Sequence, residues 1–150
     1  MRMSATLALG LLGLLAAGCA QPGPETVAAP ARLEPEVTGG QRMSGEEFRA
    51  AVFGNTLDRR LPNGARLTMH VAADGSQRLR LTAPGGQRGA DRGRIEIRGN
   101  EICSSWERID QGQPTCFAYF RLGASLVAID LAGQIEPTRF EVLRGNPERI

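Results

Sequence analysis

The sequence contains no lysine, and all 18 of its Lys and Arg positions are arginine. This absence excludes Schiff-base chemistry and serine–lysine catalysis, because both need a lysine amine. Histidine occurs once, at His70, and aromatic residues make up only 5% of the chain. The formal net charge is only +2, whereas nucleic-acid-binding proteins carry a clear basic excess. We therefore expect neither a lysine-dependent enzyme nor a nucleic-acid partner.

Long apolar runs are also rare, and the clearest one lies at the start of the chain. Ala5 to Ala17 is apolar or glycine except for Thr6 and follows the basic Met1-Arg2, and Leu15-Ala16-Ala17-Gly18 leads into Cys19. The run is shorter than the roughly 20 residues of a spanning helix. The pattern resembles the type II signal peptide of bacterial lipoproteins. This resemblance implies that residues 1–18 are cleaved and that Cys19 carries the lipid, including an acyl chain such as palmitate.

The resemblance also implies a location. Ala20 follows the cysteine, and lipoproteins kept in the inner membrane usually have Asp at that place, so we expect an outer-membrane lipoprotein facing the periplasm. Several acyl chains give stable attachment without a spanning helix. The alternative is ordinary signal-peptidase cleavage around Gly18 to Ala20, which would release a soluble periplasmic protein.

Two segments follow the signal peptide. Residues 19–43 contain four prolines and few large apolar side chains, which predicts a disordered tether behind the lipidated cysteine. Residues 44–150 are about the size of one domain with one core.

Two cysteines remain once Cys19 is assigned to lipid. Cys103 and Cys116 form an even pair in an oxidising compartment, which predicts a disulfide. Two free or metal-binding thiols are the alternative, but the sequence has no second ligand pair at zinc-like spacing. We expect no metal and no cofactor.

The domain begins with a helix signal and continues with strand signals. Ser44 and Glu47 fit a capping box, and Phe48, Ala51 and Val52 share one helical face. From Thr56 onward apolar residues alternate, and turn residues such as Asp74-Gly75 separate the runs. The pattern predicts a mainly β fold, an antiparallel meander of about eight strands that forms a small barrel or half-barrel plugged by the one short helix. The glycine-rich segment Pro84 to Arg92 predicts a mobile loop.

Several motifs of this domain are similar to those of a loose group of small exported bacterial domains of unknown function. The shared elements are an opening segment with GNTL, a DG hairpin, a C..W strand, a cysteine before an aromatic strand and a closing GNP. In this chain they are Ser44 to Leu57, Asp74-Gly75, Cys103 with Trp106, Cys116 with Phe117, Tyr119 and Phe120, and Gly145-Asn146-Pro147. The resemblance implies a fold and no activity.

Candidate catalytic groups do not form a convincing set. His70, Asp74 and Ser76 lie on two arms of one hairpin, which leaves little room for a substrate and an oxyanion hole. Ser104, Ser105 and Ser125 lie outside any G-x-S-x-G elbow. The segment Gly85 to Gly89 lacks the Lys and hydroxyl of a phosphate-binding loop. We expect no enzyme, and a hydrolase with an unrecognised site is the third choice.

Two clusters remain as binding candidates. Alternation places five arginines on one outward face, namely Arg66, Arg78, Arg80, Arg94 and Arg98. Such a face could bind lipid A phosphates or peptidoglycan carboxylates. A solvated charged face is the plainer interpretation. Aromatic residues near the cysteines could floor a ligand pocket, although a core role is the simpler expectation.

Together these features predict a non-catalytic envelope lipoprotein whose β domain serves binding or maintenance of the cell surface. Its expected partners are the membrane, through the acyl chains, and an anionic envelope component or another envelope protein. The alternative is a periplasmic inhibitor or small-ligand carrier that uses the loops at one end of the barrel.

Overall fold

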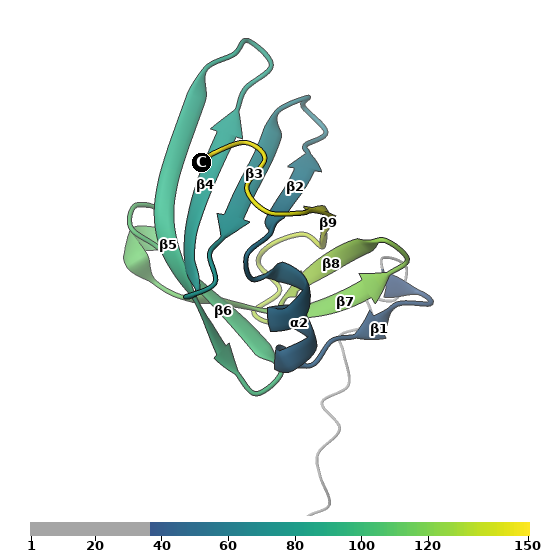
Figure 1. Ribbon diagram of the computed structural model, residues 1–150. Coiled ribbons are helices and arrows are strands. Elements are labelled where there is room, and N and C mark those ends of the chain that lie inside the picture. Colours follow the sequence, from purple (N-terminus) through teal and green to yellow (C-terminus); the bar gives the residue numbers. More distant parts are fainter. Residues whose placement is uncertain (1–36) are drawn as a thin grey trace, which may run out of the picture.

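The computed structural model describes residues 37–150, so Cys19 and the predicted signal peptide lie outside the described part. The elements follow one another as a meander after a short helix (Figure 1). They are β1 (Gln41–Arg42), α2 (Gly45–Val52), β2 (Thr56–Arg60), β3 (Arg66–Val71), β4 (Ser76–Thr82), β5 (Arg88–Arg98), β6 (Glu101–Trp106), the 3₁₀ turn η2 (Ile109–Gly112), β7 (Thr115–Leu122), β8 (Ser125–Asp130) and β9 (Thr138–Leu143).

Strands β2 to β9 form a closed antiparallel barrel, which confirms the predicted fold class. Consecutive strands pair from β2 to β9, β9 pairs back with β2, and every pairing is antiparallel. Closure leaves no long unpaired strand edge in the ring. Because the strands alternate in direction, the β2–β3, β4–β5, β6–β7 and β8–β9 connections all lie at one end of the barrel.

Helix α2 closes the other end. Ser44 Oγ accepts from the Glu47 backbone N–H and the Glu47 carboxylate accepts from the Ser44 N–H, as the capping box predicts. Phe48 and Val52 are fully buried and join the core with Leu57 and other inward side chains. The Phe48 ring lies 4.5 Å from that of Tyr119, centroid to centroid. Burial of this apolar face stabilises a helix that is too short to persist alone.

Two segments differ from the expectation. Gln41–Arg42, assigned to the tether, pairs with Arg121 and Phe120 as β1, and Met43 is buried in the core. The mobile loop predicted for Pro84 to Arg92 was wrong for its second half, because Arg88 onward belongs to β5. Gly89 and Ala90 pair with β4 residues there, so ladder hydrogen bonds outweigh the low strand propensity of glycine.

The chain after β9 folds back over the outside of the barrel (Figure 1). Gly145 donates its N–H to Asn55 Oδ1 at 2.9 Å and accepts from Thr56 Oγ1 at 2.6 Å. Glu148 reaches arginines on β3 and β4. The closing GNP motif is therefore part of the fold, and it covers polar side chains on the outer face of β2 to β4.

Among residues 37–150, no helix has both the length and the hydropathy needed to cross a membrane.

Candidate functional site

The five predicted arginines all lie on the outer face of the sheet, where alternation had placed them. Their register partners show this, since Arg66 pairs with Arg60 and Arg78 with His70, while the alternate residues Met69 and Val71 are buried inside. The structure nevertheless divides the five into arginines that are neutralised within the protein and arginines that are not.

Arg66 and Arg80 hold the C-terminal segment in place. Arg66 Nε lies 2.8 Å from Asp58 Oδ1, and its Nη1 lies 2.9 Å from Glu148 Oε1. Arg80 Nη2 lies 2.5 Å from the other Glu148 oxygen. The hydrogen bond and charge of Arg66 lower the pKa of Glu148, and the hydrogen bond to Asp58 raises the pKa of Arg66. These two arginines are structural and have little charge left for a ligand.

Arg98 is neutralised as well, through its Nη2 at 2.8 Å from Glu96 Oε2. Both side chains of this pair are more than half exposed, so the pair adds little stability. Arg94 donates to the Asp74 carbonyl at 3.3 Å, and its charge acts on the nearby Asp74 carboxylate without a direct ion pair among residues 37–150.

Arg78 and Arg92 form the least compensated part of the face. They are direct cross-strand partners on β4 and β5, and both are exposed. Neither makes an ion pair or a side-chain hydrogen bond within residues 37–150. Like charges placed directly opposite each other destabilise a sheet. Sequence reasoning missed Arg92 because its glycine-rich surroundings predicted a loop, although alternation from Arg88 through Arg98 carried the signal.

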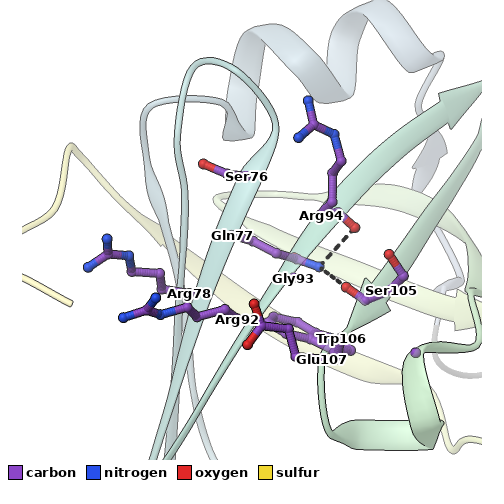
Figure 2. Close-up of a pocket in the computed structure, with 10 residues that line it drawn as sticks. Ser76, Gln77, Arg78, Arg92, Gly93, Arg94, Ser105, Trp106 and Glu107 are labelled. Carbon is purple, nitrogen blue, oxygen red and sulfur yellow. Dashed lines mark hydrogen bonds between the residues drawn. The ribbon is translucent and has the colours of Figure 1, made fainter.

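This pair borders a depression of about 470 Å³ (Figure 2). Its walls include Arg94 and Glu107, and Trp106 and Gln77 lie at its base. A second depression of about 570 Å³ shares Arg78, Arg92 and Glu107 with the first and extends to Arg149 in the C-terminal segment. We call the two together the arginine groove.

Gly93 shapes the base of the arginine groove. It pairs with Trp106, and a Cβ placed on it would lie 2.1 Å from the Ser105 carbonyl oxygen and 2.9 Å from Trp106 Cε3. Glycine is therefore required for this close approach of β5 and β6.

Gln77, at the base of the arginine groove, is only 2% exposed. Its Nε2 donates to the carbonyls of Arg94 and Ser105 at 3.2 and 3.5 Å (Figure 2). Its Oε1 has no hydrogen-bond partner in the described part of the chain. Such an unmet acceptor costs about 1–3 kcal/mol, so the base of the groove is polar and incompletely satisfied.

Asp91 fixes the far rim of the groove. Its carboxylate accepts from the backbone N–H groups of Arg92, Arg108 and Ile109 at 2.8 to 3.2 Å. Burial raises the pKa of Asp91, but these backbone hydrogen bonds outweigh it, and the net effect is a lowered pKa. The rim between β5 and η2 is thus held by a charged, buried anchor.

The remaining sequence candidates fall elsewhere. Cys103 and Cys116 are cross-strand partners joined by a disulfide, with an S–S distance of 2.06 Å, as predicted. Asp74 Oδ1 accepts from Ser76 Oγ at 2.7 Å, whereas His70 Nδ1 lies 3.3 Å from Thr56 Oγ1. The three residues weighed as a catalytic set are therefore not joined in one relay.

The chain matches no protein-family model, and comparisons with curated proteins and with solved structures found no match. Residues 37–150 hold no group of three or more His, Cys, Asp or Glu that could bind a metal ion.

Proposed function

We propose that this protein is a non-catalytic binding domain of the cell envelope, whose arginine groove holds an anionic group of an envelope component. One observation supports this most, namely that Arg78 and Arg92 stand directly opposite each other in a depression and neither forms an ion pair within residues 37–150. Other arginines of the same face have acidic partners. An anion shared by the two guanidinium groups would remove their repulsion.

The ligand that fits this chemistry is a phosphate group. Three arginines face the first depression and one glutamate opposes them, so the local charge is positive even before Arg149 is counted. Guanidinium forks match the oxygens of a phosphate in a bidentate manner. Sugar phosphates of the lipid A type are the envelope ligands of this class, and a peptidoglycan carboxylate is the competing outcome of the test.

Titration calorimetry of the mature protein with glucosamine 1-phosphate, inorganic phosphate and acetate tests the proposal. We expect phosphates to bind and acetate to bind more weakly. Arg78→Gln or Arg92→Gln should weaken binding about tenfold each, since a hydrogen bond to a charged group contributes about 1.5–3 kcal/mol and these sites are exposed.

The matched controls are Arg139→Gln and Arg144→Gln, which remove exposed arginines that do not line the groove. Binding within a factor of about two of wild type is expected for both. Equal loss in groove and control variants would mean that net charge, and not the groove, attracts the ligand. Stronger binding of acetate than of the phosphates would indicate that the groove binds a carboxylate instead.

The location of the protein in the cell is part of the same proposal. We infer that Cys19 is lipidated and that the domain is held at the outer membrane on the periplasmic side. Labelling of cells with radioactive palmitate should mark the wild-type protein and leave Cys19→Ser unmarked. A wild-type protein without label in the soluble periplasmic fraction would instead support ordinary cleavage and release.

A further inference from the structure

The interior of the barrel is filled at one end and hollow at the other. At the α2 end, Phe48, Val52, Leu57 and Val71 have no exposed surface. Toward the other end the structure has a cavity of about 240 Å³. Within residues 37–150, only Trp106 and Leu79 line both this cavity and the arginine groove. The cavity is partly open to solvent, so a small molecule could enter it.

The cavity wall is mostly apolar. It consists of inward side chains from most strands of the barrel together with Ile135 from the β8–β9 connection. The largest apolar contributors are Leu67, Leu79, Trp106, Phe117, Ile135 and Phe140. Apolar enclosure of this kind at the mouth of a barrel is typical of small-molecule sites.

The exposed apolar residues gather at the same end. Within residues 37–150 the large hydrophobic side chains with the greatest exposure are Leu81, Ile109, Leu131 and Ile135, at 37 to 45%. Leu81 precedes the β4–β5 turn, Ile109 lies between β6 and β7, and the other two lie between β8 and β9. These connections form the end opposite α2. Single exposed apolar residues are ordinary, and of these four only Ile135 lines the cavity, where it provides an exposed apolar edge.

Four polar side chains interrupt the apolar wall, namely Arg59, Ser104, Tyr119 and Thr138, and they define the ligand further. Arg59 lines the cavity and makes no ion pair or hydrogen bond with its side chain to any residue from 37 to 150. Tyr119 also lines the cavity and is only 4% exposed. Ser104 and Thr138 add two further hydroxyl groups to the wall, and the Thr138 hydroxyl donates to the Glu136 carbonyl. The half-buried Arg59 guanidinium has no ion-pair partner within residues 37–150, so a ligand with an acidic head group would supply one.

We propose that the cavity binds a short amphipathic acid, with its alkyl chain among the apolar wall residues and its carboxylate at Arg59. Burial raises the pKa of Tyr119, so its hydroxyl keeps its proton and can donate to the acid. At about 30 Å³ for a water-sized unit, the cavity has room for about eight such units. This size matches a medium-chain acid such as octanoate and is too small for a whole phospholipid.

The fluorescence of Trp106 can report binding, because Trp106 is the one tryptophan in the chain and it lines the cavity. The mature protein is titrated with octanoate, octanol, hexanoate and octylamine while Trp106 fluorescence is followed. We expect octanoate to shift the emission and to bind at least tenfold more tightly than octanol. Each methylene removed from the chain should weaken binding about fourfold, and octylamine should bind least.

Arg59→Gln tests the head group, and Arg60→Gln is its matched control, since Arg60 is the next residue, is exposed and does not line the cavity. Arg59→Gln should remove the preference for octanoate over octanol, and Arg60→Gln should keep it. Ala128→Leu should abolish binding by filling the cavity. If that variant fails to fold, the chain-length series still tests occupation of the cavity.

Two results would overturn the inference in separate ways. Absence of any Trp106 response to both octanoate and octanol would refute the cavity as a ligand site. Equal affinity for both, unchanged by Arg59→Gln, would refute the acid and leave an apolar ligand. Arg78→Gln and Arg92→Gln should leave octanoate binding intact, so failure of the groove proposal is distinguishable from failure of this one.

Discussion

Gly93→Ala tests the packing of the strands beneath the arginine groove. In a strand interior, glycine is destabilising by roughly 0.5–1 kcal/mol relative to alanine, so propensity alone predicts a more stable protein. The structure predicts the opposite, because the new Cβ would lie 2.1 Å from the Ser105 carbonyl oxygen. That carbonyl belongs to the paired β5–β6 ladder, where Arg94 is the partner of Ser105, and it cannot move without disturbing the sheet.

Overpacking of this kind costs about 1–3 kcal/mol, and we expect a net loss in this range. For a domain of this size the loss corresponds to a fall in Tm of about 4–12 °C. Thermal and urea unfolding followed by circular dichroism and by Trp106 fluorescence measures it. Gly89→Ala is the matched control on the same strand, because nothing lies within 4 Å of its Cβ position, and it should be neutral or slightly stabilising. A Gly93→Ala protein as stable as wild type would refute the packing argument.

The remaining predictions concern the disulfide, the C-terminal segment and the helix. Cys103→Ser with Cys116→Ser should lower the free energy of unfolding by about 3 kcal/mol, since the bond closes a loop between residues 13 apart, and an unchanged urea midpoint would contradict this. The hydrogen bond from Arg66 lowers the pKa of Glu148 below its usual value of about 4.5 in the folded state, so its contribution to stability is present above about pH 4.5 and is lost as pH falls through the folded pKa. Glu148→Gln should therefore reduce stability at pH 7 and flatten the loss below pH 4.5, as urea titrations at several pH values would show. Phe48→Ala should cost about 3–5 kcal/mol by opening the packed end of the barrel, and a loss below 1 kcal/mol would show that α2 is not a structural plug.

The arginines show that the sequence predicts which face of the sheet a side chain occupies but not which partners it meets there. Alternation correctly placed Arg66, Arg78 and Arg80 on one face, because the side-chain period of a strand is fixed by its geometry. The same pattern had no information on Glu148, which lies 68 residues beyond Arg80 and joins it through the fold. Which arginines stay free for a ligand therefore depended on a contact that is distant in the sequence.

The segment from Pro84 onward shows the limit of composition. Three glycines among polar residues predict a loop, yet Gly89 lies in β5 opposite Leu81. Strand propensity measures the fit of a residue to its sheet neighbours more than an intrinsic preference of the backbone. A strand supported by a neighbouring hairpin arm can therefore contain residues that would not form one in isolation.

Local chemistry in the sequence was sufficient for the capped helix, the eight main strands, their antiparallel order and the pairing of Cys103 with Cys116. Capping, alternation and turn residues act over a few positions, and each is readable where it occurs. The tertiary structure alone decided that the sheet closes, that the chain after β9 covers its outer face, and that Arg59 and Trp106 border a cavity. Those features depend on the distance between residues from different strands, which is set only when the whole sheet curls and packs around α2.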